Sequence, residues 1–104
     1  MAIGEVTVIP IGTGSTSLSS YVADMQRVLQ TVEGITFELT SMGTIIEGPV
    51  SRILAAVEAL HESPFNAGAQ RVSTSLKIDD RRDRPSTSRS KLQSVEQKLQ
   101  DGQV

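Results

Sequence analysis

The order in which apolar residues change their spacing is the feature of this chain that most limits its fold. Four segments are rich in β-branched residues that alternate with polar ones, the pattern of strands with one buried face. They span residues 3–11, 35–40, 44–47 and 71–80. Two segments between them, 18–32 and 50–60, carry apolar residues at steps of three and four, as amphipathic helices do. The expected order is therefore strand, helix, strand, strand, helix, strand.

This order predicts an α+β domain of ferredoxin-like topology, in which two helices cover one face of a four-stranded antiparallel sheet. The length fits a single domain over residues 1–104. The second and third strands are separated only by Ser41-Met42-Gly43 and should form a hairpin. The other sheet face mixes polar and charged residues with aliphatic ones, which favours assembly into a homodimer or homotetramer.

Capping and helix-breaking residues set the expected helix ends. Ser17 is the expected N-cap of the first helix, and Pro49 is expected at the first position of the second. Pro64 should end or kink the second helix, because proline lacks the N–H that an inner helical position requires.

The C-terminal part is expected to be appended to this domain. Residues 79–90 are polar, charged and turn-like. Leu92, Val95 and Leu99 lie at helical spacing and predict a helix over residues 91–100. This apolar stripe is thin for an isolated helix, so the helix must dock on something.

Composition limits the classes of function. The net charge is −2 and aromatic residues make up 3% of the chain, which leaves no basic surface or stacking platform for nucleic acid. The absence of cysteine excludes disulfides, cysteine-based zinc sites and thiol catalysis. No apolar run reaches membrane-spanning length, and the first ten residues are too polar for a signal peptide. We therefore expect a cytoplasmic protein with no nucleic-acid or membrane partner, no metal and no cofactor.

Gly12, Thr13 and Gly14 form a small polar loop before the first helix. Backbone N–H groups at a helix N-terminus can hold an anion. The loop has neither the lysine of a P-loop nor the third glycine of a dinucleotide fingerprint. A flexible capping loop is therefore the favoured interpretation, with an anion site as the alternative.

Thr44 and Glu47 lie on a short strand between two glycines. The Glu47 carboxylate can accept hydrogen bonds from an amino group or a cationic ligand, and the Thr44 hydroxyl can add one directional bond. The alternative is that Glu47 is a charge on an edge strand, which prevents strand-to-strand aggregation. Spacing alone favours neither interpretation.

The remaining polar groups give weaker indications of a functional site. The cluster of residues 79–84 holds three acidic and three basic side chains, which predicts a self-neutralising salt-bridge cluster or a subunit contact. His61, the only histidine, lies near a helix end and is expected to be partly buried instead of catalytic or metal-binding. No serine is paired with a recognisable base and orienting group, so we expect no enzyme.

Three segments together are similar to one known family. Residues 9–14, 42–48 and 71–83 resemble, in order and spacing, the YkoF-like thiamine-binding family, and the resemblance extends from about residue 3 to residue 99. It implies a ferredoxin-like fold, dimers and often tetramers, and binding of thiamine or its hydroxymethylpyrimidine part. It also implies a second helix that runs on through the region of Pro64.

With this family in view, the expected function is non-enzymatic binding of thiamine or hydroxymethylpyrimidine. Thiamine offers an aminopyrimidine edge and a cationic thiazolium ring, so a site needs a carboxylate, hydroxyls and an apolar wall. Glu47 and Thr44 are the expected polar contacts, and the soft side chain of Met42 could pack on a ring. Weaker candidates are the hydroxyls of Thr7, Ser73 and Ser75 on the more polar sheet face.

Two other functions share this element order. A regulatory amino-acid-sensing domain of ACT type is one, although such domains usually accompany an enzyme. An RNA-binding module of RRM type is the other, but it needs exposed aromatic residues where this chain has Thr44-Ile45-Ile46-Glu47.

Overall fold

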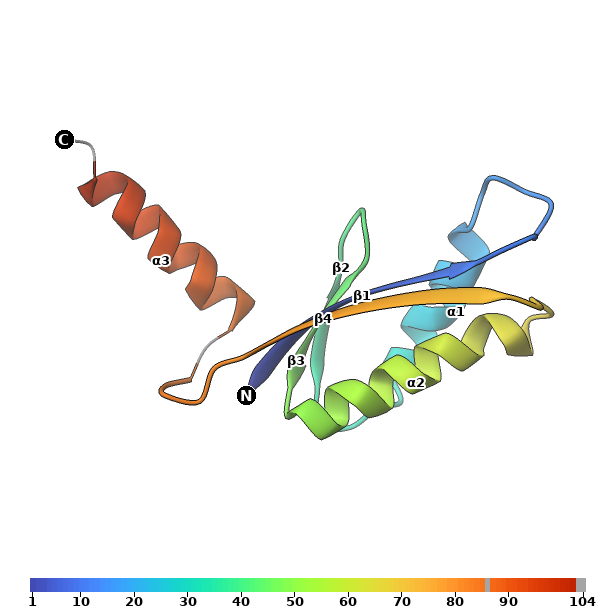
Figure 1. Cartoon of the computed structure of the whole chain (residues 1–104), viewed down its shortest axis with the longest axis horizontal. Helices are drawn as coiled ribbons and strands as arrows, with labels where there is room; N and C mark the ends of the chain where they lie inside the picture. The colour runs from blue at the N-terminus through green and yellow to red at the C-terminus, as the bar shows by residue number, and fades with distance from the viewer. Residues whose placement is uncertain (86, 103–104) are drawn as a thin grey trace.

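The structure is a computed structural model, and it describes residues 1–85 and 87–102. Its elements are β1 Ala2–Pro10, α1 Ser19–Leu29, β2 Thr36–Leu39, β3 Thr44–Gly48, α2 Val50–Asn66, β4 Val72–Asp80 and α3 Ser88–Asp101. The strands form one antiparallel sheet in the order β2-β3-β1-β4. The predicted ferredoxin-like α+β fold is confirmed, with α1 and α2 together beside the sheet (Figure 1).

The core lies between these two helices and the side of the sheet that carries the even-numbered residues of β1. Its members are almost completely shielded from solvent, which makes their burial the main apolar contribution to stability. They are Ala2, Val6, Met25, Leu29, Ile46, Ile53, Ala56 and Leu60.

Gly4 lets α2 approach this face closely. A Cβ atom at Gly4 would lie 3.0 Å from Cγ2 of Ile53, which is itself fully buried. The glycine on the central strand therefore makes room for the helix to seat Ile53 in the core.

The opposite side of the sheet, the open face, is the polar and aliphatic mixture that the alternation predicts. Its rows follow the strand register, so each β1 residue has direct neighbours on the adjacent strands. The open face comprises Ile3, Glu5, Thr7, Ile9, Thr36, Glu38, Ile45, Glu47, Ser73, Ser75, Lys77 and Asp79.

Two predicted helix starts are each wrong by one residue. The N-cap of α1 is Leu18, with no capping side chain, because the Ser17 hydroxyl instead lies 3.3 Å from that of Ser19. Pro49 occupies the N-cap of α2 in an extended conformation, so Val50 is the first helical residue.

The helix end predicted at Pro64 is also wrong, because α2 continues to Asn66, and the alternative of a kink there stays a prediction. Proline removes one backbone hydrogen bond, the one to the carbonyl four residues before it. Near the end of a helix this leaves most of the helical hydrogen bonds intact. Beyond it, the N–H of Ala67 donates to the carbonyls of Ser63 (3.2 Å) and Pro64 (3.1 Å). The continuous helix agrees with what the family resemblance implies.

The C-terminal helix begins earlier than predicted. Thr87 caps α3: its hydroxyl accepts the N–H of Ser90 at 3.0 Å, and its own N–H donates to the Ser90 hydroxyl at 2.8 Å. This reciprocal capping box moves the start from residue 91 to residue 88 and shortens the polar connection expected over 79–90. In the part of the chain that the structure describes, no helix combines the length and apolar character needed to cross a membrane.

Candidate functional site

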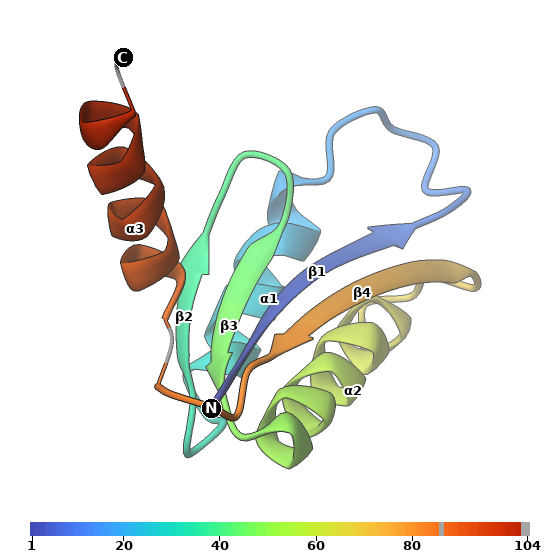
Figure 2. The same cartoon turned by 60° about the vertical axis from the view of Figure 1, so that its left-hand side comes forward.

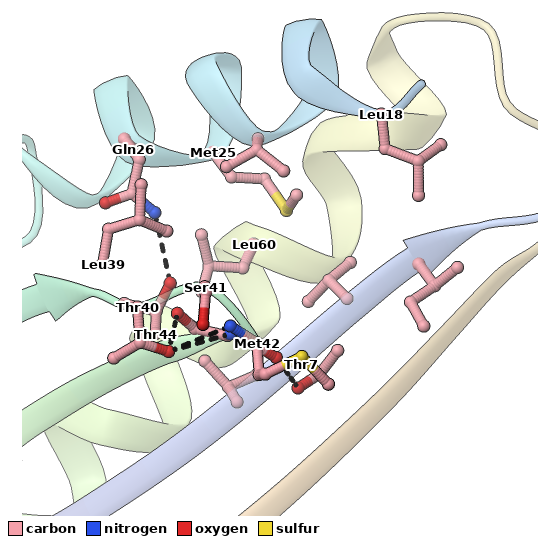
Figure 3. A pocket seen from close by; sticks show the side chains of 15 residues that line it. Thr7, Leu18, Met25, Gln26, Leu39, Thr40, Ser41, Met42, Thr44 and Leu60 are labelled. Carbon is pink, nitrogen blue, oxygen red and sulfur yellow. Dashed lines mark hydrogen bonds between the residues drawn. The ribbon is translucent and has the colours of Figure 1, made fainter. Parts of the chain in front are cut away.

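A cavity of about 380 Å³ lies between α1 and the sheet, beside the tip of the β2–β3 hairpin (Figure 3). Met25 comes from α1, Leu18 is the N-cap residue just before it, Leu60 comes from α2, and the floor is formed by β1 and β3. Of the fifteen lining residues, all of them within the described chain, none has an ionisable side chain. The cavity is therefore an apolar space with a few neutral hydrogen-bonding groups.

Gln26 is the polar side chain that α1 directs to this cavity. It follows Val22 and Met25 and precedes Leu29 on the helical face that packs on the sheet. Its Nε2 donates to the Thr44 hydroxyl at 3.2 Å, and Thr44 is 6% exposed (Figure 3). Within the described residues the structure shows no hydrogen bond to the Gln26 Oε1, which leaves an acceptor at the cavity wall.

Hydrogen bonds fix the hairpin tip that forms the rim. The Thr7 hydroxyl donates to the Met42 carbonyl at 3.1 Å. The Thr40 hydroxyl donates to the Gly43 carbonyl at 3.0 Å and accepts the N–H groups of Met42 and Gly43. The Met42 side chain is left 81% exposed at the rim, where its flexible thioether can adapt to a ring.

The six residues predicted to contact ligand do not come together. Met42 and Thr44 line the cavity, and Thr7, although it belongs to the open-face row of β1, lines it at the rim, where its hydroxyl bonds the Met42 carbonyl. Glu47 is on the open face of the sheet, on the opposite side from Thr44, because strand residues three positions apart point to opposite faces. Ser73 and Ser75 are also on the open face, exposed on the edge strand β4.

Glu47 holds the start of α3. Its Oε1 accepts the backbone N–H of Ser88 at 2.5 Å, and the Thr36 hydroxyl donates to its Oε2 at 3.4 Å. A carboxylate at a helix N-terminus is favoured by the helix dipole. The interpretation of Glu47 as an edge-strand charge is wrong, because β3 lies between β2 and β1.

The glycine loop stands away from these contacts. Gly12 and Gly14 have φ values of 79° and 78°, which glycine adopts readily. The Thr13 hydroxyl donates to the Ser15 carbonyl at 3.1 Å, so its hydrogen bond stays inside the loop. An anion site there remains a prediction.

His61 joins α2 to the edge of the sheet. Its Nδ1 lies 2.7 Å from the Thr74 hydroxyl, and its ring meets that of Phe65 edge to face at a centroid distance of 5.4 Å. The side chain is half-buried, which agrees with the structural interpretation.

The charged residues at the end of β4 and just after it form the predicted salt-bridge cluster. Arg81 binds Asp83 through two N–H groups at 2.5 and 2.9 Å, and Arg82 binds Asp80 at 2.8 Å. The hydrogen bond from Arg81 lowers the pKa of the Asp83 carboxyl from 3.8 to about 2. The bond from Arg82 likewise lowers the pKa of Asp80.

Comparison with known sequences gives one consistent result. A family model described as thiamine-binding protein matches residues 4–96. The UPF0045 protein YqgV of Bacillus subtilis is 50% identical over 103 residues, which cover 96% of this chain and 99% of the relative. A UPF0045 protein of Methanothermobacter thermautotrophicus is 46% identical over 100 residues, 95% of this chain and 100% of the relative.

Solved structures agree with the fold. A hypothetical protein from Methanocaldococcus jannaschii superposes with a TM-score of 0.82 at 36% identity, over 91% of this chain and 95% of its own. A Thermotoga maritima protein, for which a role in thiamine biosynthesis or salvage has been suggested, gives a TM-score of 0.73 at 19% identity, over 90% and 97% of the two chains. At that identity the second likeness shows the fold alone.

Proposed function

This chain belongs to the thiamine-binding protein family, and we propose that it binds thiamine, or the hydroxymethylpyrimidine part of thiamine, without catalysing a reaction on it. The observation that carries the proposal is the cavity beside the hairpin tip, with the Gln26 amide on its wall and no ionisable group among its described lining residues.

Size and polarity favour the pyrimidine ring as the buried part. Small-molecule sites span about 300–1,000 Å³, so a cavity of about 380 Å³ suits a single ring system. A cation buried without a carboxylate loses its hydration without compensation. We therefore place the neutral aminopyrimidine inside and the thiazolium ring of thiamine outward, past Met42, toward solvent.

The Gln26 amide matches the edge of an aminopyrimidine. A glutamine amide pairs with adenine by accepting from its amino group and donating to the adjacent ring nitrogen. Aminopyrimidine presents the same donor and acceptor side by side. The Thr44 hydroxyl, at 3.2 Å from Nε2, holds the amide in orientation. Met25 and Met42 supply polarisable side chains for the ring faces.

The proposal of binding without turnover is supported by the same lining. General acid–base catalysis needs a titratable group within hydrogen-bond reach of the reacting atoms. The cavity offers amide, hydroxyl and thioether groups. We propose further that the protein works as a homodimer or homotetramer, which the half-apolar open face supports.

Isothermal titration calorimetry with hydroxymethylpyrimidine and with thiamine tests the site. A bidentate pair of this kind contributes about 1–3 kcal/mol, so Gln26→Leu should raise Kd by roughly 5- to 150-fold for both ligands. Gln30→Leu is the matched control, because Gln30 is an exposed glutamine at the end of the same helix.

Two outcomes would contradict different parts of the proposal. No heat from the wild-type protein with either ligand at millimolar concentration would exclude the function. Binding that is equally strong in wild type and in Gln26→Leu would keep the function and exclude this cavity wall as its site.

A further inference from the structure

The Thr44 hydroxyl holds the Gln26 amide through a hydrogen bond that can run in either direction. Gln26 comes from α1, which lies behind the β2–β3 hairpin in Figure 2, and its Nε2 donates to the Thr44 Oγ1 at 3.2 Å. A hydroxyl both donates and accepts, and an amide carries a donor at one end and an acceptor at the other. If the amide makes half a turn about its Cγ–Cδ bond, Oε1 takes the place of Nε2 and accepts from the Thr44 O–H.

No second contact fixes the direction of this bond. Among the described residues, the structure shows one hydrogen bond to the Gln26 amide and one to the Thr44 hydroxyl, and the two are the same bond. Thr44 is 6% exposed, so its hydroxyl proton is shielded from bulk water and has no acceptor within the described chain. A buried donor without an acceptor is costly, and reversal of the amide supplies that acceptor.

The other threonine hydroxyls on the cavity wall are fixed in direction. The Thr7 O–H donates to the Met42 carbonyl at 3.1 Å, and the Thr40 O–H donates to the Gly43 carbonyl at 3.0 Å. A carbonyl can only accept, so neither bond can be reversed. Thr44 differs because its partner is an amide. The described lining residues include no ionisable group, so no charge on the wall favours one direction of that amide.

The two directions present opposite hydrogen-bonding edges to the cavity. With Nε2 toward Thr44, the amide offers a donor beside the threonine and an acceptor farther from it (Figure 3). This edge pairs with an aminopyrimidine, whose ring nitrogen accepts and whose amino group donates. With Oε1 toward Thr44, donor and acceptor change places. The reversed edge pairs, in the same ligand position, with an oxopyrimidine, in which a ring N–H replaces the ring nitrogen and a carbonyl oxygen replaces the amino group.

We propose that the cavity binds oxopyrimidines as well as aminopyrimidines, because Gln26 and Thr44 reverse their hydrogen bond to match the ring. The inference rests on the proposed function, since it concerns the same cavity, and it widens the class of ligand that this cavity accepts. Thr44 is a positioning residue that acts through Gln26, and its hydroxyl serves the two rings equally.

Isothermal titration calorimetry of the full chain with hydroxymethylpyrimidine and with its oxo analogue tests the inference. An amide fixed in one direction discriminates between the two rings by about 5- to 150-fold, so the wild-type Kd values should lie within about fivefold of each other. A larger difference in either direction overturns the inference and leaves the proposed function standing if the amino ring binds. If neither ring gives heat, both the inference and the proposed function fail.

Variants of Thr44 test whether its hydroxyl works in both directions. Thr44→Val keeps the shape of the side chain and removes the hydroxyl, so it should raise the Kd of both rings by one common factor of about 2- to 12-fold. Thr44→Ser is the matched control, which keeps the hydroxyl and should retain both affinities. If Thr44→Val weakens the binding of one ring only, or if Thr44→Ser weakens both as much as Thr44→Val does, the inference is wrong.

The direction of the amide can also be measured in solution by NMR. In the complex with hydroxymethylpyrimidine, the Gln26 Nε2 protons should show a nuclear Overhauser effect to the Thr44 side chain, because Nε2 lies next to it. In the complex with the oxo analogue this effect should weaken, because Oε1 takes that place. An effect of equal strength in both complexes overturns the reversal.

Discussion

Gly43 lies where the hairpin tip approaches β1 closely. A Cβ atom there would lie 2.7 Å from the Val6 carbonyl oxygen and 2.9 Å from the Thr7 hydroxyl. Ordinary van der Waals contact begins at 3.4 Å, so Gly43→Ala requires the tip to move by 3.4 − 2.7, or about 0.7 Å. The Val6 oxygen belongs to the backbone of a central strand and cannot rotate away.

The cost of this displacement can be estimated. Overpacking of a tightly packed site costs about 1–3 kcal/mol. For a domain of about 100 residues, 1 kcal/mol lowers Tm by about 4–8 °C, so Gly43→Ala should lower Tm by at least about 4 °C. The same movement stretches the bond from the Thr7 hydroxyl to the Met42 carbonyl, now 3.1 Å, and should weaken ligand binding at the rim.

Scanning calorimetry of Gly43→Ala and Ser41→Ala separates this steric effect from a general effect of changing the hairpin. Ser41 is an exposed residue two positions earlier, and its substitution should change stability by less than about 0.5 kcal/mol. If Gly43→Ala melts within a degree of wild type, the close approach of the tip to β1 does not exist in solution, and the shape derived for the cavity rim fails with it.

Two further predictions concern the C-terminal segment. Thr87→Ala removes the cap of α3 at a cost of about 1 kcal/mol. Amide hydrogen exchange within 88–101 should therefore accelerate about fivefold while the core amides stay protected, and an unchanged exchange rate would contradict the capping box. The pKa of Asp83 is about 2 in the folded chain and 3.8 in the reference state, so the pair with Arg81 favours the folded state above pH 3.8 and is lost as the pH falls through about 2. Because the pair is exposed, the readout is the NMR titration of the carboxyl, whose pKa should rise toward 3.8 in Arg81→Gln; equal values in both proteins would refute the assignment.

The fold could be predicted from the sequence because the alternation of apolar and polar residues within each strand indicates which of its faces is buried. The alternation in residues 35–40 and 71–80 requires no knowledge of the neighbouring strands. The helix starts were harder, because several hydroxyl-bearing residues precede α1 and α3 and each is a possible cap. Which one caps depends on backbone geometry, as the Thr87–Ser90 pair shows.

Thr44 and Glu47 do not share one face of the sheet, for a reason that the sequence already contained. Thr44 and Glu47 are three residues apart on one strand, so their side chains had to point to opposite faces. Chemistry made them a plausible pair for thiamine, but strand geometry separates them. Glu47 then meets the N-terminus of α3, a partner 41 residues away in sequence, which no local pattern indicates.

Gln26 is a site residue that the sequence can indicate, although its partner can be identified only from the folded structure. A polar residue beside Val22, Met25 and Leu29, on the apolar face of a helix, needs a hydrogen-bond partner once that face packs on the sheet. That much follows from the helical period. The identity of the partner, Thr44, and the cavity beside them follow from the pairing of β3 with β1, which brings the hairpin tip under α1. A neutral amide on an otherwise apolar helix face, opposite a strand end, is thus the local sign of a site that only the assembled sheet completes.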